Sequence, residues 1–196
     1  MNNKKKLTAG KVCIAAGICL IVAAAALLIS WQWEINSSAE KNESYTETLL
    51  SLMPEPQGAA LEERSDNAMA VLSLDGVDFS GILEMPRYSS VLPVCADWGK
   101  PSRYPCVLSG SIYDGTLQIG AAAQKGQYDF YREISVGDSV FFTDMEGNRY
   151  TLEVTDLRYE KHAGQDELSR KEAALVLFVK NMYAQEYFII YCNPAG

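Results

Sequence analysis

The longest uncharged stretch of the chain runs from Val12 to Trp31 and reads VCIAAGICLIVAAAALLISW. Its 20 residues, at about 1.5 Å per residue, would form a helix of roughly 30 Å, the thickness of the hydrocarbon core of a bilayer. This length predicts a transmembrane helix. A cleaved signal peptide is the alternative, because the alanines at 23–26 would suit a peptidase. The apolar run continues through residues 27–29, past that point, and so favours an uncleaved anchor.

The charges around this stretch predict its orientation. Four lysines lie within residues 1–11, and no acidic residue precedes Glu34. Because basic residues collect on the cytoplasmic side of a membrane, we expect residues 1–11 in the cytoplasm. Residues 12–33 would then be the anchor, with Trp31 and Trp33 at the interface and the rest of the chain outside the cell membrane.

The acidic residues lie entirely beyond this anchor. The chain has 17 Lys and Arg and 25 Asp and Glu; after the four N-terminal lysines, 13 basic residues remain against all 25 acidic ones, a net charge of −12 for residues 34–196. Such a balance is unfavourable for neutralising phosphates, which argues against nucleic acid as a partner. It suits a soluble exported domain as well as one that binds cationic partners.

Two further regions follow the anchor. Residues 34–67 are polar and acidic, are interrupted by Pro54 and Pro56, and are predicted to form a stalk. A short helix at 45–53 within it would either dock on the domain or lie at the membrane. Residues 68–196 consist of short apolar runs between turn residues, which is typical of a mainly β domain. Seven or eight strands in this length predict a closed barrel with short helices. The predicted strands are 81–85, 91–94, 117–121, 139–143, 149–157, 174–180 and 187–191, with turns at Asp144–Asn148 and Asp114–Gly115.

Five segments of this domain resemble, in order and rough spacing, the sortases, the membrane-anchored cysteine transpeptidases of Gram-positive bacteria. They are GILEMPRYSSVLPV (81–94), PCVLSGS (105–111), LQIGAA (117–122), VGDSVFFTDMEGNRYTLEV (136–154) and LVLFVKN (175–181). The pattern is most similar to the class B-like and clostridial-type branches. The resemblance implies a sortase-like closed eight-stranded β-barrel and a role in attaching surface proteins to the cell wall or to a pilin.

The catalytic residues of the family do not carry over. A sortase uses a Cys nucleophile, a His that handles protons and an Arg that holds the attacked carbonyl. The resemblance places the family His at Ala122, the Cys at Lys180 and the Arg at Tyr187, so no catalytic residue is intact. Lys180 is a poor replacement for the nucleophile, because acyl transfer to an amine forms a stable amide. We read it as a residue at the end of a strand.

The other candidate residues have ordinary interpretations. His162 is the single histidine and lies among charged residues, which favours an exposed loop over a ligand or base. Cys13 and Cys19 lie in the apolar stretch and are read as membrane residues. Cys95, Cys106 and Cys192 are an odd number outside it; buried thiols are the simpler interpretation, and one disulfide with a remaining thiol stays open. We find no cofactor or metal motif and expect neither group.

These observations predict a single-pass membrane protein with a sortase-like domain that lacks transpeptidase activity. If it functions, we expect it to bind a sorting-signal peptide, a pilin or other exported protein, or a partner sortase. The alternative is an active cysteine transpeptidase with a rearranged active site that uses Cys192, Cys106 or Cys95. The oligomeric state is left open by the sequence.

Overall fold

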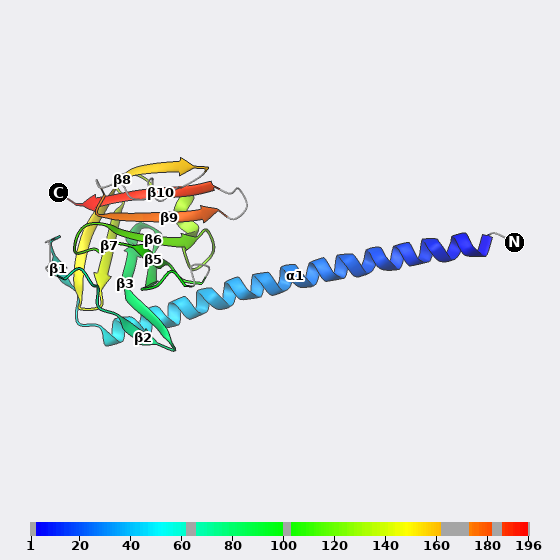
Figure 1. The fold of residues 1–196 in the computed structure, drawn as a ribbon, viewed down its shortest axis with the longest axis horizontal. Helices are drawn as coiled ribbons and strands as arrows, with labels where there is room; N and C mark the ends of the chain where they lie inside the picture. The colour runs from blue at the N-terminus through cyan, green and yellow to red at the C-terminus, as the bar shows by residue number, and fades with distance from the viewer. Residues whose placement is uncertain (1–2, 62–65, 100–102, 162–172, 182–185, 196) are drawn as a thin grey trace. The chain divides into compact units, whose positions relative to one another are not determined.

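The structure is a computed structural model, which describes residues 3–61, 66–99, 103–161, 173–181 and 186–195. It begins with one long helix, α1 (Asn3–Leu52), followed by ten strands and two short 3₁₀ helices (Figure 1). The strands are β1 (Gln57–Ala59), β2 (Leu72–Leu74), β3 (Val77–Met85), β4 (Ser90–Cys95), β5 (Cys106–Ser109), β6 (Leu117–Ala122), β7 (Ser139–Asp144), β8 (Asn148–Glu160), β9 (Leu175–Asn181) and β10 (Glu186–Pro194), and the short helices are η1 (Pro86–Tyr88) and η2 (Asp129–Arg132).

Eight of these strands close into a barrel. Hydrogen-bonded neighbours run β8–β10–β9–β6–β5–β4–β3, and β7 pairs with both β3 and β8 and so closes the ring. β1 and β2 add short pairings to β8 and β3. The barrel removes the open edges of the sheet, which would otherwise expose unpaired backbone groups. The predicted mainly β, closed eight-stranded barrel is confirmed.

Side chains alternate between the barrel interior and its outer face. On β8 the residues Tyr150, Leu152 and Val154 are buried while the residues between them are exposed. This period of two is the pattern of a strand with one face in a core. β9 differs, because residues 175–179 are buried on both faces. Leu175, Leu177 and Val179 fill the interior, whereas Val176 and Phe178 belong to a second cluster on the outside.

All seven predicted strands are present, within a few residues at each end. The predicted turns are also present: Asp144–Asn148 joins β7 to β8, and Gly115 has a positive φ of 66° in the turn before β6. β1, β2 and β5 were not among the predicted strands. Each has only three or four residues, too few to show a clear alternation, and long-range pairing decides their strand conformation.

The end of α1 packs on the barrel. Residues 38–196 form one compact unit, so the helix from Ser38 onward belongs with the strands. Leu49 is fully buried in a cluster with Phe79 and Ile82. Asn42 donates from Nδ2 to the carbonyl oxygens of Arg103 (3.1 Å) and Gly126 (2.8 Å). The predicted short helix at 45–53 is therefore the last part of a longer one, which covers the whole first half of the predicted stalk.

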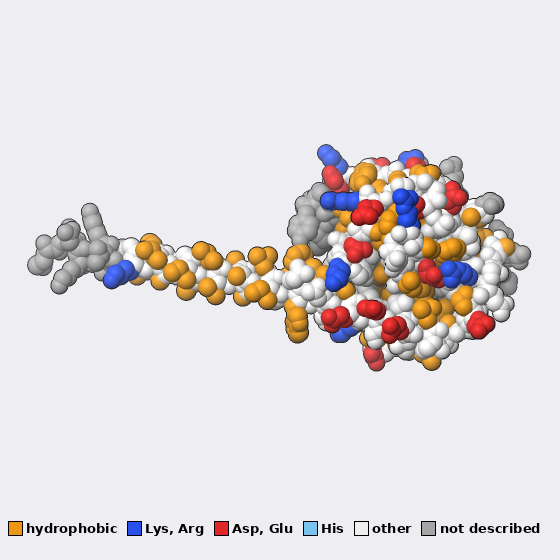
Figure 2. Space-filling model, turned by 180° about the vertical axis from the view of Figure 1, so that it is seen from behind, with side chains coloured by type: hydrophobic (Ala, Val, Ile, Leu, Met, Phe, Trp, Pro, Cys, Tyr) orange, Lys and Arg blue, Asp and Glu red, His pale blue; other side chains and the backbone are white. Residues whose placement is uncertain are grey.

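The earlier part of α1 is apolar and uncovered. An 18-residue window with a mean hydropathy of 3.0 lies near the N-terminus, and none of it is buried among the described residues. Figure 2 shows hydrophobic side chains exposed along this helix. A helix from the core of a globular domain would be mostly buried. Length and composition fit a membrane span, and a signal sequence has the same properties.

Candidate functional site

The strand register brings the three predicted site positions into one row. Ala122, the last residue of β6, pairs with Lys180 on the parallel strand β9. Lys180 pairs in turn with Tyr187, at the start of the antiparallel strand β10. Neighbouring strands lie about 4.8 Å apart, so the three backbones adjoin. Lys180 and Tyr187 follow Ala122 by 58 and 65 residues in sequence, yet the three lie side by side at one end of the β6–β9–β10 surface.

The backbone at Ala122 is held on both sides by the loop that follows it. Its amide donates to Oε1 of Gln127 at 2.8 Å, and its carbonyl oxygen accepts from the amides of Gln124 (3.0 Å) and Tyr128 (3.3 Å). Gln127 is buried, so these contacts are shielded from water. Position 122 is thus well ordered by its hydrogen bonds, but a methyl group can neither take up nor deliver a proton.

The outer face of β6 and β9 is covered by an aromatic residue that the sequence analysis did not single out. Trp98, from the loop after β4, lies 5.4 Å from Phe178 on β9, ring centre to ring centre. A Cβ at Gly120 on β6 would come within 2.2 Å of Phe178 and 2.6 Å of Trp98. Gly120 therefore lets both rings approach the strand. No local signal marks Trp98, because its partners are more than 20 residues away in sequence.

The barrel interior holds one cysteine. Cys192 on β10 is fully buried in the main core, and burial raises the pKa of its thiol above the ordinary value. Tyr128 is also fully buried, and its hydroxyl has no hydrogen-bond partner among the described residues. Burial raises the pKa of Tyr128 as well, with Cys192 and Cys106 adding to the effect. A protonated, enclosed thiol of this kind is a poor nucleophile for an external substrate.

The other predicted candidates divide between described and undescribed parts of the chain. His162 lies outside the described residues, and so does the predicted loop that contains it. Cys95 and Cys106 are buried on neighbouring strands. No group of three or more His, Cys, Asp or Glu side chains with metal-binding geometry occurs in the part of the chain that the structure describes.

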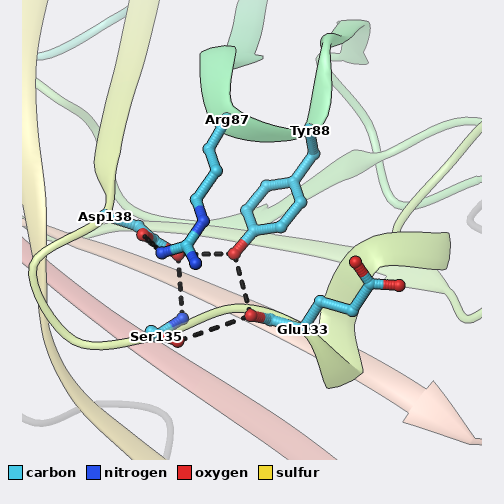
Figure 3. Close-up of polar contacts among 5 residues, drawn as sticks. All are labelled: Arg87, Tyr88, Glu133, Ser135 and Asp138. Carbon is cyan, nitrogen blue, oxygen red and sulfur yellow. Dashed lines mark hydrogen bonds and ion pairs between the residues drawn. The ribbon is translucent and has the colours of Figure 1, made fainter.

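A polar cluster around Asp138 joins two of the segments on which the resemblance to the sortases rests. Asp138, in the loop before β7, accepts from Nη1 of Arg87 (2.6 Å), from the hydroxyl of Tyr88 (2.5 Å) and from the amide of Ser135 (2.8 Å), as Figure 3 shows. The Tyr88 hydroxyl also lies 2.9 Å from the carbonyl oxygen of Glu133. Burial, followed by the hydrogen bond with Asp138, raises the pKa of Tyr88 to about 12.

The carboxylate of Asp138 is thereby paired from three sides. Burial raises the pKa of Asp138, but the hydrogen bonds from Tyr88, Ser135 and Arg87 together lower it by more. The pKa of Asp138 therefore lies below its ordinary value. A carboxylate whose ionised form is favoured and which accepts three hydrogen bonds is suited to holding η1 against the β7 loop. We therefore read this cluster as a structural link rather than a site of chemistry.

Comparison with solved structures identifies the fold. The chain is similar to sortase C-3 from Streptococcus pneumoniae (15% identity, 84% of this chain and 83% of that one, TM-score 0.54) and to sortase A from Corynebacterium diphtheriae (14%, 83% and 84%, 0.53). It is also similar to the Clostridium perfringens sortase D5 transpeptidase (9%, 84% and 95%, 0.51). No protein-family model and no curated protein matches the sequence. At these identities the likeness establishes a sortase-like fold.

Proposed function

We propose that this protein is a membrane-anchored sortase-like protein that lacks transpeptidase activity and binds an exported peptide or protein. The row Ala122–Lys180–Tyr187 carries the proposal. The resemblance of the five segments to the sortases places the family's catalytic His, Cys and Arg at these three positions. Residues that share one reaction must lie together, and the register that joins these three supports the matching.

The residue types in that row cannot support acyl transfer by a thiol. Ala122 offers no base, Lys180 no thiol and Tyr187 no permanent positive charge. The rest of the described chain does not compensate, since Cys192 is enclosed in the core and Cys95 and Cys106 are 5% and 0% exposed. A barrel of this fold still presents strands and side chains that an extended peptide can bind without covalent chemistry.

The proposed location follows from α1. We place residues 1–11 in the cytoplasm, residues 12–33 in the cell membrane and the barrel outside, with 34–67 and 68–196 as the stalk and domain of the sequence prediction. The exposed apolar window supports the anchor, and the lysines before it support the orientation. In this setting the candidate partners are a sorting-signal peptide, a pilin or other exported protein, and an active sortase of a Gram-positive-type cell.

The direct test uses the full chain purified in detergent. It is incubated with a fluorogenic library of sorting-signal peptides and hydroxylamine, and mass spectrometry searches for acyl adducts while fluorescence anisotropy measures binding. We expect saturable binding without cleavage and without an adduct. A thioester on any cysteine, or cleavage that is lost when one cysteine is replaced, would instead support the alternative of an active transpeptidase with a rearranged site.

A second experiment tests the matched positions. In the variant with Ala122→His, Lys180→Cys and Tyr187→Arg, we expect the cysteine at position 180 to react with iodoacetamide at least about tenfold faster than in the single variant Lys180→Cys. The reason is that a neighbouring His and Arg stabilise a thiolate. Equal rates in two folded variants would contradict the assignment of the row. Full turnover is not expected, because the surrounding residues also position a reaction.

A further inference from the structure

Two of the buried cysteines are direct neighbours in the sheet. Cys95 ends β4 and Cys106 begins β5, and the parallel pairing of these strands consists of this one residue pair. Paired residues on adjacent strands lie about 4.8 Å apart. Disulfides join residues whose Cα atoms are roughly 4.4–6.8 Å apart, so the backbone spacing already suits a bridge.

Their side chains also lie on the same side of the sheet. Cys95 and Cys106 belong to the cluster that contains Phe79, Tyr104 and Leu49 of α1. The residues next to them along the strands, Val94 and Val107, belong to the barrel interior instead. Both thiols therefore face outward beneath the end of α1, where they can approach each other.

Each thiol contacts a carbonyl oxygen of its own loop. Each Sγ lies 3.3 Å from a carbonyl oxygen, that of Asp97 for Cys95 and that of Tyr104 for Cys106. Thiol hydrogen bonds are weak, and exchanging them for a covalent bond sacrifices little. Cys192 belongs to the interior cluster, on the opposite side of the sheet, and is thereby identified as the remaining thiol of the odd set.

We propose that Cys95 and Cys106 form a disulfide as the domain folds. The two thiols lose two protons and two electrons, an S–S bond forms, and the disulfide of a thiol–disulfide carrier accepts the electrons and is reduced to two thiols. The inference rests on the proposed function in one respect, the placement of the domain outside the membrane, where disulfides persist. Both side chains are buried in the folded domain, so exchange precedes closure of the cluster by α1.

The bridge would close the segment 96–105 at its base. That segment carries Trp98, which contacts Phe178, and Cys106 is itself the cross-strand partner of Gly120. A covalent link between the ends of the segment restricts the positions available to Trp98. Oxidation would therefore hold the ring over the outer face of β6 and β9, the face that ends at Ala122.

The test uses the full chain in detergent, in a background with Cys13→Ala and Cys19→Ala, so that three thiols remain. The protein is reduced and unfolded, refolded with a mixture of reduced and oxidised glutathione, alkylated and digested. We expect a peptide that joins Cys95 to Cys106, lighter by two hydrogen atoms than the reduced pair, and an alkylated Cys192. A pair involving Cys192, or three alkylated cysteines, would overturn the proposal.

Thermal unfolding provides an independent readout. Closing a loop of this length is expected to raise Tm by about 5–10 °C over the reduced protein. Cys106→Ser should abolish this difference between oxidised and reduced samples, whereas Cys192→Ala should retain it. An equal Tm for the oxidised and reduced protein that keeps Cys95, Cys106 and Cys192 would contradict the bridge, even if the further variants fail to fold.

A parallel arm separates this inference from the proposed location. Cells are quenched with acid and alkylated before lysis, and the same peptides are examined. A bridge that forms on refolding but is absent in cells would contradict placement of the domain outside the membrane and leave the thiol pair supported. If no bridge forms on refolding, the proposed Cys95–Cys106 disulfide is wrong, and the proposed location of the domain is not affected.

Discussion

Single side chains in this protein stabilise contacts between segments that are distant in sequence. Asp138 is the clearest case: its carboxylate is buried and receives hydrogen bonds from η1, 50 residues earlier, and from its own loop. Asp144 is similar, since its fully buried carboxylate accepts from the hydroxyl of Tyr113 and from the amides of Glu146 and Asn148, each at 2.9 Å. Asp138 holds η1 to the loop before β7, and Asp144 holds the loop of Tyr113 to the turn between β7 and β8.

Replacing Asp138 should weaken the fold without changing its shape. We expect Asp138→Asn to lower the free energy of unfolding by about 2 kcal/mol, because hydrogen bonds to a charged acceptor are lost in a buried place. Arg87 contributes little to this value, since its side chain is 61% exposed. Urea unfolding measures the difference. Asp129→Asn, at an exposed position in η2, is the matched control, and an equal effect of both variants would refute the role of Asp138.

The same residue predicts a dependence on pH. Because the pKa of Asp138 is lower in the folded protein than its ordinary 3.8, the folded state favours the ionised form. Its contribution is complete above the ordinary pKa and is lost as the pH falls through the folded value. Between pH 5 and about pH 3, wild-type stability should therefore decrease more than that of Asp138→Asn. Parallel curves for the two proteins would contradict this prediction.

At the scale of elements, the end of α1 acts as part of the domain. Gly126 lies so close to Ala39 that a Cβ there would be 2.6 Å from that methyl group, and Tyr45 contacts Phe79 and Tyr104 with ring centres 5.4 and 5.9 Å apart. These contacts bury one side of the helix. Leu50 and Leu52, which flank the buried Leu49 around the helix, are exposed.

Two adjacent leucines test this packing. Leu49 is 0% exposed and Leu50 is 48% exposed. Leu49→Ala should reduce the free energy of unfolding by about 2–5 kcal/mol, because it leaves a cavity between α1 and the barrel. Leu50→Ala should change it by no more than about 0.5 kcal/mol. Chemical denaturation of the two variants decides the matter, and similar losses would mean that the helix does not dock through Leu49.

For the whole molecule, the apolar part of α1 predicts a membrane anchor. We expect the full chain to remain with membranes after alkaline carbonate extraction and its intact mass to include residues 1–11. A shortened mass that begins between residues 23 and 30 would identify a cleaved signal peptide instead. Either result leaves the barrel unchanged, because its core is formed within residues 38–196.

Charged substitutions provide the control for that experiment. Leu20→Arg combined with Ile21→Arg should release the protein from the membrane, since each arginine costs about 2.5–3.5 kcal/mol at the centre of a bilayer helix. Leu52→Arg, at an exposed position outside the apolar stretch, should leave it membrane-bound. Retention of the double variant after extraction would contradict the anchor.

Much of the fold was predictable because its signals are local. The alternation of β8, the turn residues Asp144–Asn148 and the uncharged run of α1 can each be read within one continuous segment of the chain. The segments resembling sortases located the row at Ala122, Lys180 and Tyr187, although only pairing could bring the three positions together. Docking of the helix at 45–53 on the domain was one of two predicted alternatives, but its continuity with the apolar helix in α1 was not predicted, because the acidic, polar sequence between them reads as a stalk.

The sequence by itself determined the apolar helix, the mainly β domain, the excess of acidic residues and the identity of every residue available for chemistry. Tertiary structure alone decided which of them meet: Cys95 with Cys106, Trp98 with Phe178, and Asp138 with Arg87 and Tyr88. The physical reason is that periodicity and turn propensity depend on neighbours along the chain, whereas these contacts depend on strand register and barrel closure.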